Sequence, residues 1–308
     1  MIVNVEPESG KNPVLEIIKE SQKYLRLNYY LIDDPDIMSA IEERVNNKVN
    51  VRIIIDGQPY EGSSNSSLEA LRKTGAQVNI SPSRFDGTDV FDHAKYMYNE
   101  KRYLIGTMNM TDAAFKGNRE YFVVGDERKI HKSLDSIFES DWKGERAGDV
   151  DRKNLIVSPD SENRILGMLR DGKKLLIETE ELGNDKDILE TLRGKGRKVK
   201  MILPSSLSEE DMNNAIDLMK SGANIKIMPA DKLYMHAKMI HTGKFVFIGS
   251  QNFSNTSLIK NREVGIMIRK FSLKRVFSAT FKEDWKKCQQ HNKKDEKRGK
   301  DINFFAEQ

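Results

Sequence analysis

Two segments of this chain carry the same chemically active side chains in the same order. The first set is His93, Lys95, Asn109 and Glu120, and it returns 143 positions later as His236, Lys238, Asn252 and Glu263. A histidine can attack an electrophile or move a proton, while a lysine and an amide can hold the oxygens of a phosphoryl group. A carboxylate can accept a ring N–H and so fix the histidine tautomer. Two such sets facing one another supply a nucleophile and a proton donor together.

The residues around these sets recur in the same register. Thr107 matches Ser250, Asn118 matches Asn261, and the pair Asp141–Trp142 matches Asp284–Trp285. Several motifs at one offset without an insertion indicate a duplication. Upstream, residues 51–56 parallel 199–204 in a slightly shifted register. We therefore expect a first repeat over 1–145, a second over 155–285, and a basic C-terminal tail over 286–308.

Helices and strands alternate within each repeat. Helices are expected from Asn12, from Asp34–Pro35 and over 67–74, with strands over 26–31 and 51–55; the second repeat has helices near 161–171, 185–194 and 208–221. This order predicts an α/β fold of two halves related by a pseudo-two-fold. Each half would hold a mixed, mostly parallel sheet flanked by helices, with one active site at the interface.

The histidine and lysine of each set are expected on one strand of a hairpin. Residues 234–240 read as a single strand, which places His236 and Lys238 on the same face, roughly 7 Å apart along the strand. A turn at 242–244 and a second strand over 245–249 would bring Ser250 and Asn252 back to the histidine. The first half would do the same with Thr107 and Asn109.

The paired His-x-Lys, Gly-[Ser/Thr]-x-Asn and Glu motifs resemble the phospholipase D superfamily, also called the HKD phosphodiesterases. The resemblance covers nearly the whole chain. It implies that one histidine forms a covalent phosphohistidine while the other protonates the leaving alkoxide and then activates water or an acceptor alcohol. The family pattern favours His93 as the nucleophile and His236 as the acid and base. No metal or other cofactor is implied.

The sequence departs from the family pattern at one position in each half. The family places an aspartate five residues after the lysine, and here that position holds Glu100 and Gly243. Because that aspartate has a supporting role in the family, all eight residues of the two sets remain the expected catalytic residues. Lys95, Lys238, Asn109 and Asn252 are the expected phosphate contacts.

Several other residues have two readings. Thr107 and Ser250 could contact phosphate or support their neighbours, and Asn118 and Asn261 could serve the site or cap a turn. The two Asp–Trp pairs are expected to be packing and capping features. His131, His241 and His291 have no matching partners and are expected to be structural.

Composition and hydropathy limit the partners and the cellular location that we expect. The net charge of +4 hints only weakly at an anionic partner, and one cysteine, Cys288, excludes an internal disulfide. No apolar run approaches the roughly 20 residues that span a bilayer, and the N-terminus has no signal-peptide pattern. We expect a cytoplasmic enzyme, or a secreted one if a signal peptide was removed. Since one chain carries both sets, we expect a functional monomer.

The substrate class stays open between three readings. The duplication within one chain and the segment 249–258 resemble lipid-side members of the family, which favours phospholipid headgroup hydrolysis or phosphatidyl transfer. The polar loop 61–67 offers few apolar anchors for a membrane, so a metal-independent nuclease is the alternative. The aromatic residues Phe85, Phe91, Phe115 and Phe253 could contact acyl chains or bases. A non-catalytic module that binds phosphorylated ligands is the third reading.

Overall fold

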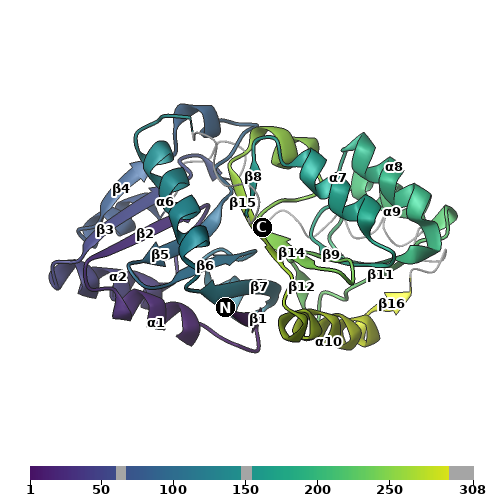
Figure 1. Ribbon diagram of the computed structural model, residues 1–308, viewed down its shortest axis with the longest axis horizontal. Helices are drawn as coiled ribbons and strands as arrows, with labels where there is room; N and C mark the ends of the chain where they lie inside the picture. The colour runs from purple at the N-terminus through teal and green to yellow at the C-terminus, as the bar shows by residue number, and fades with distance from the viewer. Residues whose placement is uncertain (60–66, 147–154, 291–308) are drawn as a thin grey trace.

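The computed structural model describes residues 1–59, 67–146 and 155–290. It contains two eight-stranded sheets that lie side by side with helices around them (Figure 1). The second half of the chain forms one sheet, and the first half forms the other together with one strand, Tyr234–Met235, from the second half. The first half contains β1 (Ile2–Glu6), α1 (Asn12–Glu20), β2 (Tyr24–Tyr29), α2 (Pro35–Asn46), β3 (Asn50–Ile55), α4 (Leu68–Lys73), β4 (Gln77–Ile80), β5 (Lys95–Asn99), β6 (Tyr103–Gly106), α5 (Asp112–Lys116), β7 (Asn118–Gly125) and α6 (Arg128–Trp142).

The second half repeats this plan. Its elements are β8 (Leu155–Ser158), α7 (Glu162–Asp171), β9 (Leu175–Thr179), α8 (Lys186–Lys195), β10 (Val199–Leu203), α9 (Glu209–Lys220), β11 (Asn224–Ile227), β12 (Tyr234–Met235), β13 (Lys238–His241), β14 (Val246–Gly249), β15 (Glu263–Ile268), α10 (Phe271–Lys287) and β16 (Gln289–Gln290). Short helical turns lie at Ser83–Phe85, Gly196–Lys198 and Thr256–Lys260.

Both sheets are mixed, as predicted, but parallel pairs are in the minority. The first sheet runs β1-β7-β6-β5-β2-β3-β4, and only β2-β3-β4 are parallel within that half. The second runs β16-β11-β10-β9-β13-β14-β15-β8, and only β9-β10-β11 are parallel. The prediction of mostly parallel sheets was therefore wrong. Tight hairpins, such as the one joining β5 to β6, force neighbouring strands to be antiparallel.

Local sequence explains the elements that carry the site strands. Pro13 lies in the first turn of α1, whose buried Val14, Ile17 and Ile18 follow helical spacing. The Asp34 side chain accepts hydrogen bonds from the backbone N–H groups of Asp36 and Ile37 and so caps α2. The apolar run of β3 is buried on both faces of its sheet, with α1 and α2 covering one of them.

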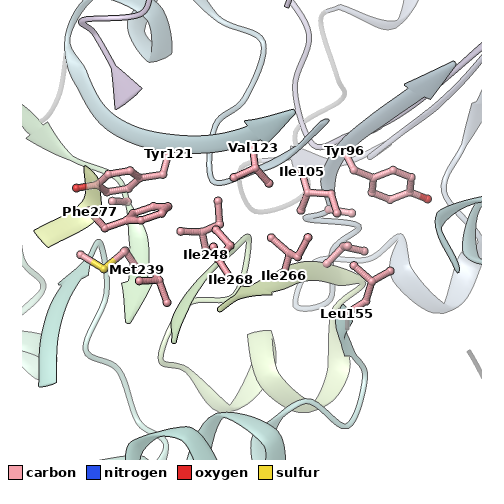
Figure 2. Close-up of a cluster of buried hydrophobic side chains, with 14 of the residues drawn as sticks. Tyr96, Ile105, Tyr121, Val123, Leu155, Met239, Ile248, Ile266, Ile268 and Phe277 are labelled. Carbon is pink, nitrogen blue, oxygen red and sulfur yellow. The ribbon is translucent and has the colours of Figure 1, made fainter. Parts of the chain in front are cut away.

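Three apolar clusters hold the molecule together. One lies between the first sheet and helices α1 and α2, and its counterpart lies between the second sheet and helices α7 to α9. The third joins the halves: Tyr121 and Val123 of β7 face Ile248 of β14 and Ile266 of β15 (Figure 2). Helices α6 and α10 pack against this shared core. Because the two sheets bury one continuous surface, the halves are held in a fixed relation.

The chain crosses between the halves just before each histidine. Residues 234–240 do not form the single predicted strand. Instead, β12 leaves its own half and pairs in parallel with β7 of the first half, while β13 begins only at Lys238. In the first half, Asp92 likewise bridges to Arg262 and the His93 N–H donates to the Arg262 carbonyl at 2.9 Å. Each histidine is therefore placed at the start of the opposite half's glutamate strand.

The predicted boundaries between the two repeats and the tail lie close to residues that the structure does not describe. The first half ends with α6, the second begins with β8, and residues 147–154 between them lie outside the described residues. The expected tail starts inside α10 and β16, and 291–308 are not described. The division into 1–145, 155–285 and 286–308 stays a proposal.

Candidate active site at the interface of the halves

The two lysines occupy matching positions and make matching contacts. Lys95 and Lys238 are the first residues of β5 and β13, and both are buried. The Lys95 ammonium donates to the His93 backbone carbonyl at 2.9 Å, and the Lys238 ammonium donates to that of His236 at 2.8 Å. Two buried cations therefore lie beside the two histidines.

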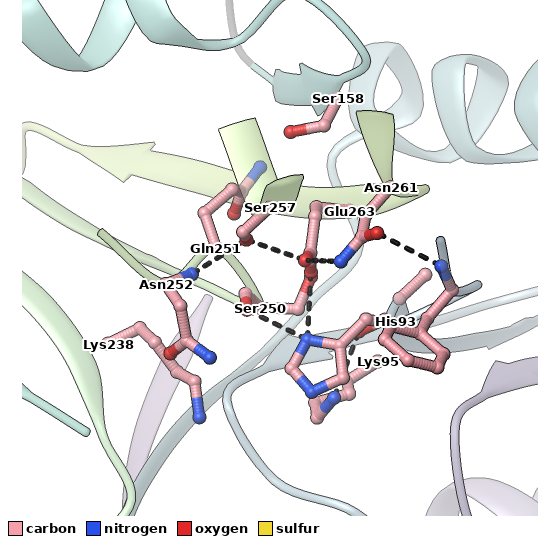
Figure 3. Close-up of polar contacts among 12 residues, drawn as sticks. His93, Lys95, Ser158, Lys238, Ser250, Gln251, Asn252, Ser257, Asn261 and Glu263 are labelled. Atoms are coloured by element: carbon pink, nitrogen blue, oxygen red, sulfur yellow. Dashed lines mark hydrogen bonds and ion pairs between the residues drawn. The ribbon is translucent and has the colours of Figure 1, made fainter. Parts of the chain in front are cut away.

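Each histidine is held by the glutamate of the other half. His93 Nδ1 lies 3.1 Å from Glu263 Oε2, and His236 Nδ1 lies 2.6 Å from Glu120 Oε1. Figure 3 shows His93 Nδ1 in contact with both the Glu263 carboxylate and the Ser250 backbone carbonyl. Sequence reasoning anticipated a glutamate for each histidine but not this exchange. The exchange makes neither half complete alone, so the four motifs form one composite site.

The glutamates are themselves held in place by short polar side chains. Glu120 accepts a hydrogen bond from the Thr107 hydroxyl and another from the Asn118 amide at 3.3 Å. Glu263 accepts from the Ser257 hydroxyl at 2.6 Å and the Asn261 amide at 3.2 Å. Asn118 and Asn261 thus serve the site. Ser257 has no equivalent in the repeat register, which is why the sequence comparison missed it.

The charge state of each glutamate follows from its histidine. Burial opposes ionisation of Glu120 and Glu263, but the facing imidazole, a nearby lysine and a hydroxyl together outweigh it and keep the pKa of each carboxyl below its ordinary value. A carboxylate at Nδ1 requires a proton on that nitrogen. His93 therefore keeps Nε2 as the nitrogen available to a substrate.

Burial changes the titration of the first half's histidine and lysine. Burial and then the charge of Lys95 lower the pKa of His93, although Glu263 opposes this. Burial and then the charge of Lys238 lower the pKa of Lys95 to about 7. A neutral His93 beside a cation is the state that suits nucleophilic attack on a phosphate ester.

Two buried ion pairs fasten the glutamate strands across the interface. The Arg262 guanidinium contacts Asp141 through Nε at 2.8 Å and Nη2 at 2.9 Å. Arg119 binds Asp284 in the same way, at 2.5 and 2.9 Å. Both arginines directly precede the site glutamates. The expectation that the Asp–Trp pairs are only packing and capping features was therefore wrong for the aspartates, although Trp142 does stack on Phe138.

The two asparagines of the motifs each carry a buried polar atom without a partner among the described residues. The side-chain oxygens of Asn109 and Asn252 are buried and have no hydrogen-bond partner in the part of the chain that the structure describes. Asn252 also lines the cavity that contains His93 in its wall. Buried polar groups are normally satisfied, so an unpartnered amide at a cavity suits a ligand-binding role.

Thr107 and Ser250 are used differently from the asparagines. The Thr107 hydroxyl serves Glu120 and accepts from the Tyr121 N–H at 3.0 Å, while the Ser250 hydroxyl accepts from the Val264 N–H at 3.0 Å. Both residues are fully buried. Their hydroxyls support the glutamate strands here, and a direct phosphate contact for them stays a prediction.

Glu180 is a site residue that the sequence reasoning missed. Its Oε2 lies 2.6 Å from the Lys238 ammonium and 3.3 Å from His236 Nε2. Burial opposes ionisation of Glu180, but His236 and then Lys238 outweigh it and lower its pKa. It follows β9 and has no matching acid in the first half, so a search for recurring residues passed over it. The signal that could have found it is a glutamate directly after a strand that pairs with the histidine segment.

A cavity of about 500 Å³ opens beside His93. Aromatic rings of Tyr30 and Phe91, the Asn252 amide and the carboxyl groups of Asp89 and Glu181 line it. Within the described ranges, no lysine or arginine is part of this lining. Burial and then Glu180 raise the pKa of Glu181 to about 7. The cavity lining is therefore aromatic and acidic, and the buried Lys95 and Lys238 are not part of it.

Comparison with known families agrees with this geometry. A family model described as cardiolipin synthase, PLD-like domain matches residues 14–142 and 172–285, which include all four motifs of both halves. The chain belongs to the phospholipase D superfamily. As a member it is a phospholipase D-like phosphodiesterase, built from two such repeats in one chain.

Relatives within the superfamily are distant. The chain is 27% identical to a mitochondrial cardiolipin hydrolase of Xenopus tropicalis over 51% of this chain and 70% of that protein. It is 23% identical to a cardiolipin synthase of Oceanobacillus iheyensis over 82% of this chain, which is 61% of the length of the synthase.

Solved structures share the fold. Phosphatidylserine synthase from Haemophilus influenzae matches with a TM-score of 0.66 over 94% of this chain and 87% of that chain, at 11% identity. Polyphosphate kinase from Porphyromonas gingivalis matches with a TM-score of 0.71 over 95% of this chain and 52% of the kinase, at 16% identity. At such identities the likeness concerns the fold alone.

The departures from the phospholipase D pattern lie at hairpin turns. Glu100 accepts from the Gln22 N–H at 3.0 Å, and Gly243 adopts a positive φ of 83° in the turn after β13. Both positions follow the strand end remote from the histidine. His131 contacts the Asn99 carbonyl and His241 accepts from the Gly243 N–H, so both are structural, while His291 lies outside the described residues.

The remaining sequence expectations have mixed outcomes. Of the four aromatic residues considered for substrate contact, only Phe91 lines the cavity, because Phe85, Phe115 and Phe253 are buried in the protein. Loop residues 61–66 lie outside the described residues. Across the described ranges, no helix has the length and apolar character needed to cross a bilayer, and no group of three or more histidine, cysteine or acidic side chains is arranged to hold a metal.

Proposed function

We propose that this protein cleaves or transfers phospholipid phosphodiesters through a covalent phosphohistidine on His93. The observation that carries the proposal is the reciprocal exchange of glutamates, with Nδ1 of each histidine bound to the opposite half. Both imidazoles are thereby oriented by contacts across one interface, and neither Nε2 atom is used by these glutamates, although His236 Nε2 lies 3.3 Å from Glu180. A two-step displacement needs two such groups.

The proposed first step is attack on phosphorus. The Nε2 lone pair of neutral His93 forms a P–N bond while the P–O bond to the leaving alcohol breaks. His236 gives its Nε2 proton to the departing alkoxide. Lys95, Lys238 and the amides of Asn109 and Asn252 hold the non-bridging oxygens as their charge develops.

The second step restores the enzyme. Neutral His236 removes a proton from water or an acceptor alcohol, the new P–O bond forms, and the P–N bond to His93 breaks. Hydrolysis and phosphatidyl transfer differ only in the molecule that enters here.

Two observations support a lipid substrate over a nucleic acid. The cavity lining combines aromatic rings with the carboxyl groups of Asp89 and Glu181. Proteins that bind nucleic acid strands use grooves of positive charge instead. The cardiolipin hydrolase and synthase relatives also carry names that refer to a phospholipid. A cytoplasmic location and action as a monomer stay predictions from the sequence.

One set of assays tests the proposal. The purified chain is incubated with bis(p-nitrophenyl) phosphate with and without EDTA, and with phosphatidylglycerol or phosphatidylcholine vesicles beside single-stranded and plasmid DNA. We expect turnover that resists chelation, headgroup release from vesicles, and neither product with His93→Asn. DNA cleavage without a lipid product would replace the lipid proposal with a nuclease, and a folded protein with no turnover would indicate a binding module.

A further inference from the structure

The two halves of the site differ at one matching position. In the first half, Tyr29 pairs with Lys95 across β2 and β5, and Tyr30 follows. In the second half, Thr179 pairs with Lys238 across β9 and β13, and Glu180 follows. The residue after each strand therefore lies beside the lysine and histidine of its own half.

These two residues make opposite kinds of contact. The Tyr30 ring packs edge-on against His93 at 5.0 Å between centroids, and the Lys95 ammonium lies 5.4 Å from its centre. Glu180 instead places Oε2 on the Lys238 ammonium and on the reactive nitrogen of His236. Its Oε1 accepts from the Tyr234 hydroxyl at 2.9 Å. One half therefore faces the substrate with a neutral ring and the other with a carboxylate.

This carboxylate uses the same donors as a substrate phosphate. Lys238 and His236 Nε2 are the groups assigned to the phosphate oxygens and the leaving group, and Glu180 contacts both. Its side chain is 19% exposed, so it is confined within the site without being sealed into the core. A bound phosphate must share these cations with Glu180 or displace it.

The charges then discriminate between phosphate species. A phosphodiester carries one negative charge, whereas a phosphomonoester carries about −1.5 to −2 near neutral pH. A fixed carboxylate repels the second species more strongly, because Coulomb energy scales with the product of the charges. We propose that Glu180 makes the site selective for singly charged phosphodiesters and promotes release of doubly charged phosphomonoesters.

The inference deepens the proposed function, on which it rests. Hydrolysis of a phospholipid diester leaves a lipid phosphomonoester, which has more charge than the substrate. Without a counter-charge, two lysines would hold that product more tightly than the substrate. Glu180 returns to Lys238 as the monoester leaves.

A pair of small ligands tests this without turnover. Isothermal titration measures the dissociation constants of methyl phosphate and dimethyl phosphate for the wild type and Glu180→Gln, at a pH above the second pKa of the monoester, about 6. We expect Glu180→Gln to bind methyl phosphate about tenfold more tightly and dimethyl phosphate at most about threefold more tightly. Below that pH the difference between the ligands should shrink, which a merely structural role would not produce.

Three further variants serve as controls. Glu180→Tyr copies the first half and should shift the preference in the same direction, and Tyr234→Phe should do so more weakly by removing one hydrogen bond to Glu180. Glu190→Gln on α8 removes one exposed negative charge and should leave both dissociation constants unchanged. If Glu180→Gln folds and the ratio of the two constants does not move, or the monoester binds more weakly, the inference is wrong.

The outcome separates this inference from the proposed function. A shifted binding ratio in a protein that cleaves no diester would support the role of Glu180 and reject the catalytic proposal. Diester cleavage with an unshifted ratio would do the opposite.

Discussion

The two halves of the candidate active site share four residue types but differ in the charge around them. Among the described residues, the carboxylate that contacts His93 is Glu263 at Nδ1, and Tyr30 packs against the ring. His236 lies between Glu120 at Nδ1 and Glu180 at Nε2. The duplicated motifs build a symmetric frame, and single residues outside the motifs make its two ends unequal. We infer that this inequality assigns attack to His93 and proton transfer to His236.

Substitution of either histidine should have the largest effect on activity, and it tests whether both halves take part in catalysis. We expect His93→Asn and His236→Asn each to lower the steady-state kcat by several orders of magnitude, because the first variant lacks the nucleophile and the second lacks the base that activates water in the second step. Steady-state kinetics with bis(p-nitrophenyl) phosphate measure this. His241→Asn, at a turn outside the site, is the matched control and should keep near-normal activity. If His236→Asn also kept normal activity, the second half would be a relic.

The interface ion pairs test whether the halves are fastened equally. Asp141→Asn should destabilise the protein by about 3–5 kcal/mol, because it leaves Arg262 buried without its carboxylate. Asp284→Asn should cost less, since Arg119 retains Glu8 at 2.5 Å. Urea unfolding measures both. The exposed pair Arg193–Asp217 provides the control, because Asp217→Asn should cost about 0–1 kcal/mol. Equal, small effects for all three variants would contradict the role of the two buried ion pairs in holding the halves together.

The lysines test the charge difference directly. Lys95→Ala and Lys238→Ala should each remove about 2–4 kcal/mol of transition-state stabilisation. Glu180→Gln should restore part of the loss in Lys238→Ala, because the unpaired carboxylate then no longer faces the phosphate. It should restore less in Lys95→Ala, where Lys238 still pairs with Glu180. A double-mutant cycle on kcat/KM measures the coupling, and equal rescue of both lysine variants would mean that the halves do not differ in this way.

The pH profile sharpens the assignment of roles. Protonation of His93 removes the nucleophile, so kcat/KM should fall as the pH is lowered through the pKa of His93. Because burial lowers this pKa, the fall should occur below about pH 6.5, the ordinary pKa of histidine. Loss of the Lys95 proton should lower kcat/KM as pH rises through about 7. Lys95→Arg keeps its charge and should move the basic limb upward. A basic limb that stays in place would exclude Lys95 as its source.

Sequence alone predicted the motifs and much of the element order, and the reasons for the misses are physical. Recurrence identified the histidines, lysines, asparagines and glutamates because both copies keep them. It could not predict that β12 pairs with the other sheet, since strand pairing depends on contacts far apart in the chain. The exchange of glutamates and the Arg262–Asp141 pair follow from that crossing. Glu180 escaped because a feature present in one copy has no partner to reveal it.

Trapping of the intermediate tests the central claim most directly. In His236→Asn, p-nitrophenolate can leave from bis(p-nitrophenyl) phosphate without a proton, but no base remains to activate water. We predict a burst of about one p-nitrophenolate per active site, with the phosphoryl adduct located on His93 by mass spectrometry of rapidly quenched peptides. A folded variant that shows no burst and no adduct, or that carries the adduct on another residue, would contradict the account.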